Sequence, residues 1–453
     1  MDNASVDDAI FALATPWGES AIAVIRVSGK KSLSLLAKVV RCRIDIPDAG
    51  GRTIHHGTFR NPENGETVDE IMIAVYKAPN SYTGEDGAEI FTHGSPAIIN
   101  TVMGSLINAG FRQAGPGEFT QRAFLKGKID LTRAEAVNEL IRARSDRART
   151  LAFNRLSGAI EERINALKEK LADLLAAVEI MIDYPDEDMT VEHDAWLADI
   201  RSVEEQIAGL LATYQTGKII QEGISAVIAG RTNAGKSTLF NLLLREDRAI
   251  VSETHGTTRD YLEGAVVIRG VPIRLFDTAG LRKTENSLEM EGIRRTDQLL
   301  DGADLILLVV DGAEGLADED RAFLRKYGTD GKVLKIWNKT DRPGMHCPPD
   351  FIPLSSRTGA GLETLHRKIG EAFINENSIE TGEPVIDSLR QKKLLEECTR
   401  SLAAFRRGIT DDRSLDLLAV DLKAAMECLG EITGIVTTED MLQRMFSRFC
   451  VGK

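Results

Sequence analysis

The chain has 453 residues, which is too long for one hydrophobic core, so we expect two or three domains. Hydrophobic residues make up 43% of the sequence, and no apolar run is long enough to span a bilayer, which excludes a transmembrane protein and predicts no membrane partner. The formal net charge of −13 repels phosphate backbones at long range, so any nucleic acid must be held by a local basic face or by a basic partner.

The first 120 residues alternate β-like runs with turns. Two such runs lie at 22–27 and 71–76, and a helix-like stretch at 98–109 separates them from the sequence PGEF at 116–119. This mixture predicts a small α+β domain over residues 1–120.

The chain start and the cysteines indicate the compartment. The start MDNASVDDAIF is acidic and has neither a basic segment followed by an apolar stretch nor an Arg-rich presequence, so it predicts no secretory or mitochondrial address. The five cysteines are widely spaced and form no C-x-x-C pair, which argues against a zinc cluster and a disulfide framework. We therefore expect a cytoplasmic protein.

Helical character begins near Thr132 and continues to about residue 216. Apolar residues recur there at spacings of three and four, the pattern of long amphipathic helices. They are Ile160, Ile164, Leu167, Leu171, Leu174 and Leu175. The sequence DYPDED at 183–188 interrupts the pattern with Pro185 and a cluster of carboxylates, which favours an interhelix loop over a metal site.

A basic stretch also lies in this helical region. It contains Arg142, Arg144, Arg147, Arg149 and Arg155. A solvated helix face paired with nearby carboxylates is the favoured interpretation, and a contact with a nucleic acid is the alternative.

The segment from 220 to 378 has a different pattern, in which short β-rich runs alternate with helices. The runs lie at 225–229, 266–268, 273–276, 305–310 and 333–337. This pattern predicts a mostly parallel, doubly wound sheet. Helical character returns after Asp387. The fold class is therefore α/β and all-α multidomain, with a helical domain in two parts, 121–219 and 379–453, and an α/β domain inserted at 220–378.

The sequence GRTNAGKS at 230–237 fits the phosphate-binding pattern G-x-x-x-x-G-K-[ST]. It follows an apolar strand and precedes a helix-like run, the context that the motif requires. Its glycines let backbone N–H groups face phosphate, Lys236 supplies charge for the β- and γ-phosphates, and the Ser237 hydroxyl is suited to Mg²⁺.

Two further segments are expected to sense the γ-phosphate. DTAG, at 277–280, closes an apolar run, so that Asp277 is suited to Mg²⁺ and the Gly280 N–H to the γ-phosphate. GTTRD, at 256–260, lies between the P-loop and DTAG, where a switch segment is expected, and Thr258 is its candidate Mg²⁺ ligand. The residue after DTAG is Leu281. Many GTPases have a water-orienting glutamine at that position, so this group must come from elsewhere.

NKTD, at 338–341, follows the run VLKIW and predicts guanine selectivity. The Asp341 carboxylate accepts hydrogen bonds from the guanine ring N–H and exocyclic amine, and adenine has no donors there. Ser355, Ser356 and Arg357 follow the next apolar run, and we expect them to support the base through backbone contacts.

The chain resembles the MnmE (TrmE) family of tRNA-modification GTPases over nearly its whole length. The resemblance is carried by ATPWGESAIAVIRVSG, NSYTGEDGAEIFTHG, PGEFTQRAFLKGKIDLTRAEAVNELI, the nucleotide motifs and the terminal GEITGIVTTEDMLQRMFSRFCVGK. The FCVGK end is specific because general GTPases lack it. Departures are HGS in place of HGG at 93–95, His255 in the switch, and Val451 where isoleucine is usual.

The resemblance implies a Ras-like GTPase domain with defined ions and a catalytic acid. It implies potassium held by Asn233 with carbonyl groups of Ser252, Thr254 and Thr257, and Mg²⁺ held by Ser237 and Thr258. It also implies that Glu289 orients the attacking water. The complete expected GTP-binding set is Asn233, Ala234, Gly235, Lys236, Ser237, Thr238, Ser252, Thr257, Thr258, Asp277, Thr278, Ala279, Gly280, Asn338, Lys339, Asp341, Ser355, Ser356 and Arg357.

The family also implies a second site and partners. Its N-terminal domain forms a homodimer and binds 5-formyl- or methylene-tetrahydrofolate, whose contacts correspond here to Arg26, Glu89 and Lys128, with Lys453 nearby. An FAD-containing subunit, MnmG (GidA), completes a heterotetramer that adds an aminomethyl or carboxymethylaminomethyl group to carbon 5 of the tRNA wobble uridine. Cys450 is either part of that chemistry or a small buried side chain.

Two other classes of protein fit parts of the sequence. A GTPase of ribosome assembly would have the same nucleotide motifs, but it would need neither the folate-like signature nor FCVGK. A scaffold with a decayed site is disfavoured because Lys236, Ser237 and Asp341 are all present.

Overall fold

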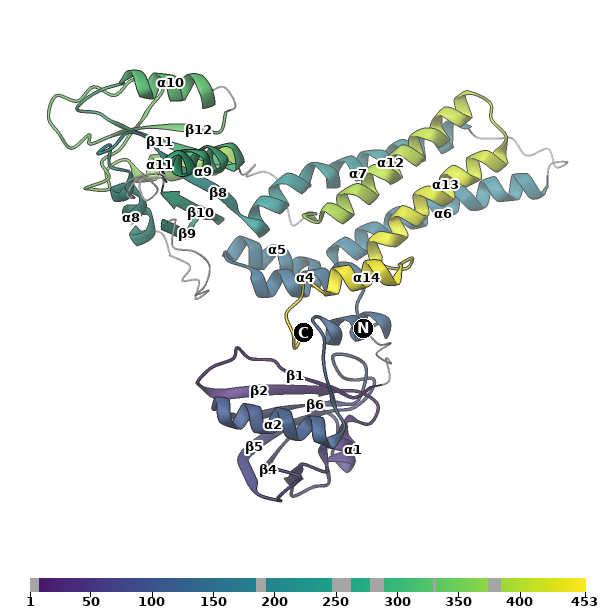
Figure 1. Cartoon of the computed structure of the whole chain (residues 1–453). Helices are drawn as coiled ribbons and strands as arrows, with labels where there is room; N and C mark the ends of the chain where they lie inside the picture. Colours follow the sequence, from purple (N-terminus) through teal and green to yellow (C-terminus); the bar gives the residue numbers. More distant parts are fainter. Residues whose placement is uncertain (1–7, 185–192, 247–261, 278–288, 329–330, 374–383) are drawn as a thin grey trace. The chain divides into compact units, whose positions relative to one another are not determined.

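The computed structural model describes residues 8–184, 193–246, 262–277, 289–328, 331–373 and 384–453. The chain divides into two compact units, Met1–Asn138 with Glu427–Lys453, and Glu139–Met426 (Figure 1). The expected domain limits at 120, 219 and 378 stay predictions. No helix among the described residues is long and apolar enough to cross a membrane.

Seven strands form one sheet in the described part of the first unit, in the order β3-β4-β5-β6-β2-β1-β7. The strands are β1 (Ile10–Leu13), β2 (Ser20–Ser28), β3 (Val40–Cys42), β4 (Thr53–Arg60), β5 (Thr67–Tyr76), β6 (Gly87–Gly94) and β7 (Arg112–Gln113). All neighbours pair antiparallel except β1 and β7. The strands expected at 22–27 and 71–76 lie within β2 and β5, and both expectations are confirmed.

Helices cover this sheet and close the unit. They are α1 (Ser32–Leu36), the 3₁₀ helix η1 (Ile46–Asp48), α2 (Pro96–Ala109), α3 (Glu118–Leu125) and α14 (Glu439–Phe446). Val102 and Leu106 of α2 are fully buried in one core with Phe11, Ile73 and Ile90 of the sheet. Pro96 begins α2 and Gly110 ends it with φ of 109°, the asymmetry that is typical of helix ends.

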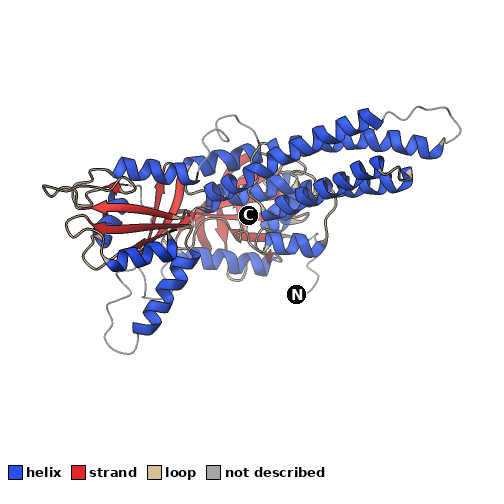
Figure 2. Ribbon diagram, turned by 90° about the horizontal axis from the view of Figure 1, so that it is seen from above, coloured by secondary structure: helices blue, strands red, loops and turns tan. Residues whose placement is uncertain are grey.

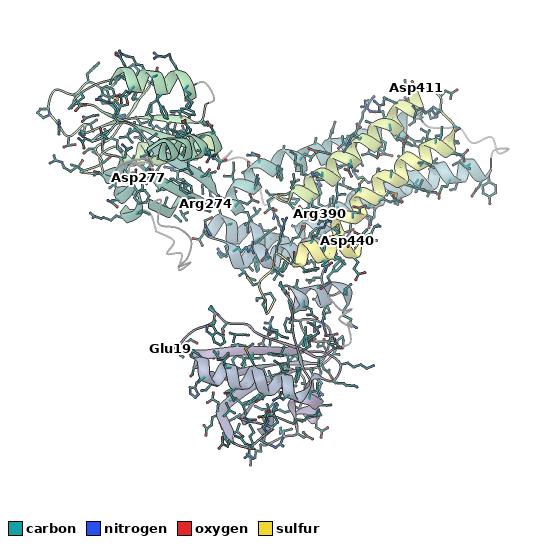
Figure 3. All side chains as sticks on the ribbon, in the orientation of Figure 1. Glu19, Arg274, Asp277, Arg390, Asp411 and Asp440 are labelled. Carbon is teal, nitrogen blue, oxygen red and sulfur yellow. The ribbon has the colours of Figure 1, made fainter. Side chains whose placement is uncertain are left out.

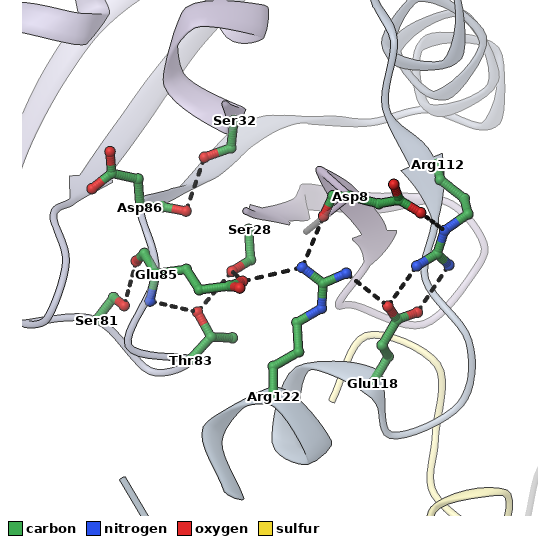
Figure 4. Close-up of polar contacts among 10 residues, drawn as sticks. All are labelled: Asp8, Ser28, Ser32, Ser81, Thr83, Glu85, Asp86, Arg112, Glu118 and Arg122. Carbon is green, nitrogen blue, oxygen red and sulfur yellow. Dashed lines mark hydrogen bonds and ion pairs between the residues drawn. The ribbon is translucent and has the colours of Figure 1, made fainter. Parts of the chain in front are cut away.

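A buried ionic network ties the 81–86 loop to α3 (Figure 4). Arg122 is 2% exposed and pairs with Glu85 at 3.1 Å and Glu118 at 2.9 Å. Arg112 also holds Glu118, at 2.6 Å. Burial works to raise the pKa of Glu118, but hydrogen bonds from Arg112, the Gly115 N–H and Arg122 outweigh it and hold this pKa below its ordinary value.

Long helices form the part of the second unit that lies outside the inserted block (Figure 2). They are α5 (Asp146–Leu156), α6 (Ala159–Asp183), α7 (His193–Glu222) and α12 (Leu389–Thr410), while α4 (Leu131–Arg142) and α13 (Leu415–Thr433) each contribute residues to both units. Five of the six apolar residues expected on one helix face are buried on α6, and Leu175 is half-buried. The 183–188 segment lies mostly outside the described residues, and α6 ends at Asp183.

The inserted block contains a six-stranded sheet among its described residues, in the order β13-β12-β11-β8-β10-β9. The strands are β8 (Ile224–Ala229), β9 (Leu262–Ile268), β10 (Val271–Asp277), β11 (Leu305–Asp311), β12 (Val333–Asn338) and β13 (Ile352–Pro353). All pairings are parallel except that of β9 with β10. The five expected strand runs lie in β8 to β12, so the mostly parallel sheet is confirmed.

Helices α8 (Lys236–Glu246), α9 (Glu289–Gly302), α10 (Asp318–Tyr327) and α11 (Leu362–Phe373) connect these strands. β8 lies between β11 and β10, so the strand order reverses at β8. Ligands of open α/β sheets bind beyond the carboxyl ends of the strands at such a reversal. The segment that follows β8 is therefore the expected ligand site.

Candidate functional site

The 230–235 segment turns sharply between β8 and α8. Its backbone has φ of 136° at Gly230, 63° at Asn233 and 100° at Gly235, a region that side chains with a Cβ rarely adopt. A Cβ on Gly230 would lie 2.2 Å from the Val309 carbonyl oxygen, and one on Gly235 would lie 2.2 Å from Nδ2 of Asn338. Glycine is therefore required at both positions.

Lys236 and Ser237 begin α8. Lys236 contacts the P-loop backbone, and Ser237 contacts the carboxylate of Asp277. Lys236 is 7% exposed, and its Nζ donates to the carbonyl oxygens of Gly230 at 2.9 Å and Arg231 at 2.7 Å. Ser237 Oγ donates to Asp277 Oδ2 at 2.8 Å. Asp277 is 1% exposed at the end of β10, the strand that also carries Arg274 (Figure 3).

Asn338 joins the P-loop to the loop after β13. Its Nδ2 donates to the Ala234 carbonyl oxygen at 2.7 Å, and its Oδ1 accepts from the N–H and Oγ of Ser356, both at 2.9 Å. Lys339 has φ of 68° and donates to Asp311. These contacts hold three sequence motifs in one fixed arrangement.

Asp341 accepts two side-chain hydrogen bonds, from Ser355 Oγ and from Arg357 Nη2, each at 2.6 Å. The hydrogen bond from Ser355, then the Asp341 backbone N–H and then Arg357, hold the pKa of Asp341 below its ordinary value, so the carboxylate is ionised at neutral pH. Sequence reasoning expected backbone support from the 355–357 segment and missed these side-chain contacts.

A cavity of about 500 Å³ opens between these segments. Its lining residues are Gly235, Thr238, Asn338, Lys339, Asp341, Arg342, Pro343, Ser356 and Arg357. Arg342 and Pro343 are additions to the expected set, and their position directly after NKTD is the signal that could have identified them. The cavity lies beyond the carboxyl end of β12, on the edge where a doubly wound sheet binds ligands.

Part of the expected set lies outside the described residues. These residues are Ser252, Thr254, Thr257, Thr258, Thr278, Ala279 and Gly280. Glu289 is the first residue of α9, and its expected catalytic role stays a prediction.

A second cluster of expected residues lies in the first unit. Arg26 on β2 faces Glu89 on β6, and its Nη2 lies 2.7 Å from Glu89 Oε1. The Arg26 guanidinium lies 5.6 Å from the ring centre of Tyr82 and 5.8 Å from that of Phe119. Arg26 Nη1 donates to the Gly452 carbonyl oxygen at 3.3 Å, so the chain end belongs to this cluster.

The C-terminal tail, residues 450–453, pairs with the segment before α3. The N–H of Gly117 donates to the Cys450 carbonyl oxygen at 3.3 Å, and that of Phe119 to the Lys453 carbonyl oxygen at 3.2 Å. Burial, and then the charge of Arg26, lowers the pKa of the Lys453 amine. Cys450 is exposed. Lys128 Nζ donates to the Pro79 carbonyl oxygen at 2.9 Å.

The basic stretch in α4 and α5 needs a correction at Arg155. This residue is 2% exposed, and its Nη1 pairs with Glu139 at 2.6 Å and Asp387 at 2.5 Å. Arg155 therefore does not lie on a solvated face, because both its guanidinium and its partner Asp387 are buried. Arg149 does fit that interpretation, being 60% exposed and paired with Asp146 at 3.4 Å.

Two family models match the chain. One describes the MnmE helical domain and matches residues 131–450; the other describes the GTP-binding protein TrmE N-terminus and matches residues 9–128. The tRNA modification GTPase MnmE of Streptococcus pyogenes serotype M1 is 40% identical over 453 residues, which cover 98% of this chain and 98% of that protein. The chain belongs to the MnmE family of tRNA modification GTPases.

Another MnmE, from Streptococcus thermophilus strain CNRZ 1066, has the same identity and coverage. Among solved structures, Aquifex aeolicus Era bound to GDP and AlF₄⁻ matches 39% of this chain and 66% of its own, with 25% identity and a TM-score of 0.27. The G domain of the T. maritima FeoB iron transporter matches 33% of this chain and 98% of its own, with 28% identity and a TM-score of 0.25. Membership of the MnmE family rests on the family models and the relatives, because these TM-scores are too low to support an inference.

Proposed function

We propose that this MnmE-family chain hydrolyses GTP and uses the cycle to drive modification of carbon 5 of the wobble uridine in certain tRNAs. The observation that carries the proposal is one cavity that is lined both by Gly235 of the P-loop, with Thr238 of α8, and by the ionised Asp341. A phosphate-binding segment and a guanine acceptor that line one cavity fit the two ends of one nucleotide.

Base selection follows from the chemistry of Asp341. Its two oxygens already accept from Ser355 and Arg357, which fixes the orientation of the carboxylate, and each oxygen keeps further lone pairs for the guanine N–H groups. Adenine presents no donors at that edge, so it would leave the carboxylate without base contacts.

The residues present fit Mg²⁺. Ser237 and Asp277 bring a hydroxyl and a buried carboxylate within 2.8 Å, and oxygen ligands of this kind are those that Mg²⁺ prefers. We infer that Ser237 and Thr258 would bind the ion directly, with Asp277 in support. When bound, Mg²⁺ neutralises charge on the β- and γ-phosphates.

Potassium and the attacking water complete the proposed site. Asn233 is exposed in the P-loop with φ of 63°, so its amide oxygen is accessible to a cation, and Ser252, Thr254 and Thr257 would supply further oxygens. A potassium ion there supplies positive charge near the transferred phosphate, as an arginine finger does in other GTPases. Glu289 would hold the attacking water, since Leu281 cannot.

The Arg26 cluster fits a reduced folate. A guanidinium beside two aromatic rings suits a planar heterocycle and an anionic tail, and Glu89 suits the donor edge of a pterin. We propose Arg26, Glu89, Lys128 and Lys453 as its contacts. When bound, the folate supplies the one-carbon unit, and an FAD-containing MnmG subunit of the heterotetramer supplies the redox chemistry.

The homodimer and Cys450 belong to the same proposal. Cys450 is exposed and its backbone carbonyl accepts from the Gly117 N–H, so the thiol is accessible on a tail whose backbone is held, and we propose that it is available for the modification chemistry. We place this system in the cytoplasm, where its tRNA substrate is found.

Mass spectrometry of tRNA nucleosides tests the proposal. A strain that lacks this chain should lose the modified wobble uridine, and the wild-type gene should restore it, whereas Lys236→Ala should not. An unchanged nucleoside profile in the deletion strain, together with defective ribosomal subunits, would favour the assembly GTPase instead.

A further inference from the structure

The turn between β9 and β10 lies at the far end of the strand that positions Asp277. The turn consists of Arg269 and Gly270, with φ of 49° and 83°, and positive φ at both residues is the type I′ geometry of a two-residue hairpin. β10 runs from this turn directly to Asp277, whose carboxylate accepts from Ser237. A displacement of the turn along the strand direction therefore changes the position of Asp277.

Helical elements contact this hairpin at close range. A Cβ on Gly270 would lie 2.6 Å from Cδ and 3.0 Å from Cγ of Arg147 on α5, so the aliphatic part of Arg147 lies against the turn. Gly223, which follows α7, is equally close to β10, since its Cβ would lie 2.4 Å from the Pro272 carbonyl oxygen. Arg269 pairs with Glu363 of α11, so the turn is held between α5 and α11.

The other end of α5 is anchored where the chain returns from the inserted block. Arg155, eight residues beyond Arg147, donates to the Val385 carbonyl oxygen from Nε at 2.9 Å and from Nη2 at 2.7 Å. Its ion pairs with Glu139 and Asp387 are buried with it. One apolar cluster lies beside them, formed by Ala148, Leu151, Ile220 and Val385.

The chain passes from the helical part into the inserted block near Ile220 and returns near Val385. The contacts above connect α5 to both of these points. Ile220 lies just before β8, and Val385 lies just before α12. A buried arginine that loses either carboxylate would leave an uncompensated charge, so α5 and the 385–387 segment move together. Packed interiors transmit such displacements because they have low compressibility.

We propose that Arg147 is a positioning residue for GTP hydrolysis, and that α5 couples the position of β10 to the helical part of the chain. The inference rests on the proposed GTPase function and specifies how that site is regulated. Arg147 holds the hairpin turn and, through β10, Asp277; a nucleotide-dependent shift of β10 is passed through Arg147 to α5 and the 385–387 segment. The same contacts let a movement of the helical part displace β10 and Asp277, and so change the hydrolysis rate.

Three variants of the full chain test this proposal. Arg147→Ala removes the contact with Gly270, Arg147→Lys keeps the aliphatic stem, and Arg149→Ala removes an exposed arginine of the same helix. We expect Arg147→Ala to lower kcat about tenfold while changing nucleotide Kd by less than about twofold. Arg147→Lys and Arg149→Ala should stay close to the wild type.

Hydrogen exchange of the α5 amides supplies the coupling measurement. In the wild type, exchange in α5 should differ between GDP and a non-hydrolysable GTP analogue, and Arg147→Ala should remove that difference. Equal exchange in both nucleotide states of the wild type would overturn the inference, as would an Arg147→Ala variant that matches Arg149→Ala in kcat and exchange. A wild-type chain without GTP hydrolysis would overturn the proposed function, and this inference with it.

Discussion

At the scale of single residues, Asp341 carries the proposed guanine selectivity. Both of its oxygens are oriented by protein donors, one a buried serine and one an exposed arginine. This arrangement matters because a carboxylate that is already oriented loses less conformational freedom when it binds the base.

Asp341→Asn should exchange guanine preference for xanthine preference. Xanthine has a carbonyl group where guanine has its exocyclic amine, and the amide of the variant would donate to it. We expect GTP affinity to fall by about a hundredfold or more, with a gain for xanthosine triphosphate. Nucleotide titrations measure both constants, and Asp350→Asn, on an exposed carboxylate, is the control. GTP affinity that stays at the wild-type value would contradict the assignment.

Glu118 provides a prediction about stability and pH. Its pKa in the folded chain lies below the ordinary value, so its contribution to stability is present above the pKa of the unfolded chain and is lost as pH falls through the folded value. Glu118→Gln should lower the free energy of unfolding of the first unit by about 3 kcal/mol at neutral pH, because Arg122 stays buried with one carboxylate fewer. The loss should shrink toward acid pH.

Denaturant unfolding between neutral and acid pH checks this expectation. Glu19→Gln removes an exposed carboxylate of the same unit and is the control. A pH dependence of stability identical in Glu118→Gln and the wild type would mean that Glu118 does not titrate as its contacts require.

The residues that could be predicted from the sequence are those whose partners lie in the same short motif. Lys236 donates to Gly230 and Arg231, six and five residues away, so one contiguous segment of sequence already specifies the local geometry. Arg155 meets Val385, 230 residues away, and Arg26 meets Gly452, 426 residues away. No local sequence pattern identifies partners that lie so far along the chain. Arg155 was therefore expected on a solvated face, and only the family resemblance assigned Arg26 to the folate site.

At the scale of elements, the C-terminal tail forms part of the Arg26 cluster through its backbone. Gly452 has φ of 95°, and a Cβ there would lie 2.6 Å from the Leu13 carbonyl oxygen. Gly452→Ala should therefore displace the tail and remove its contact with Arg26. Gly65→Ala is a matched control, because Gly65 has φ of 73° and open space around its Cβ position.

Retention of a reduced folate by the purified chain measures the effect. Gly452→Ala should weaken folate binding about tenfold or more while GTP hydrolysis is unchanged, since the tail contributes contacts to one site only. Equal folate binding in Gly452→Ala and Gly65→Ala would show that the tail is not part of that site.

The strand order illustrates which features of the elements the sequence can and cannot supply. Apolar runs predicted where β8 to β12 lie, because buried parallel strands are continuous hydrophobic segments. The pairing of β9 with β10 is local, across a two-residue turn, but the contacts of that turn with Arg147 and Glu363 join residues far apart in the chain. Those contacts, and the coupling proposed from them, required the structure.

At the scale of the whole molecule, the two candidate sites belong to different compact units. Arg26 and Glu89 lie in the first unit, while Ser237 and Asp341 lie in the second. Arg26→Ala should therefore spare GTP hydrolysis but abolish folate binding and tRNA modification. Arg26→Ala that loses GTP hydrolysis outright while still binding folate would contradict two separate sites, and tRNA nucleoside profiles measured alongside hydrolysis rates distinguish the outcomes.

GTP hydrolysis by the purified full chain, measured in potassium and in sodium at equal ionic strength and compared with ATP, tests the central claim most directly. The account predicts rapid hydrolysis of GTP in potassium, slow hydrolysis in sodium because the smaller ion shortens the coordination distances, and no hydrolysis of ATP. Asn233→Ala should remove the potassium stimulation and leave nucleotide binding largely intact. Equal rates in the two salts would contradict the potassium site, and equal rates for GTP and ATP would contradict the assignment of the cavity as a guanine-nucleotide site.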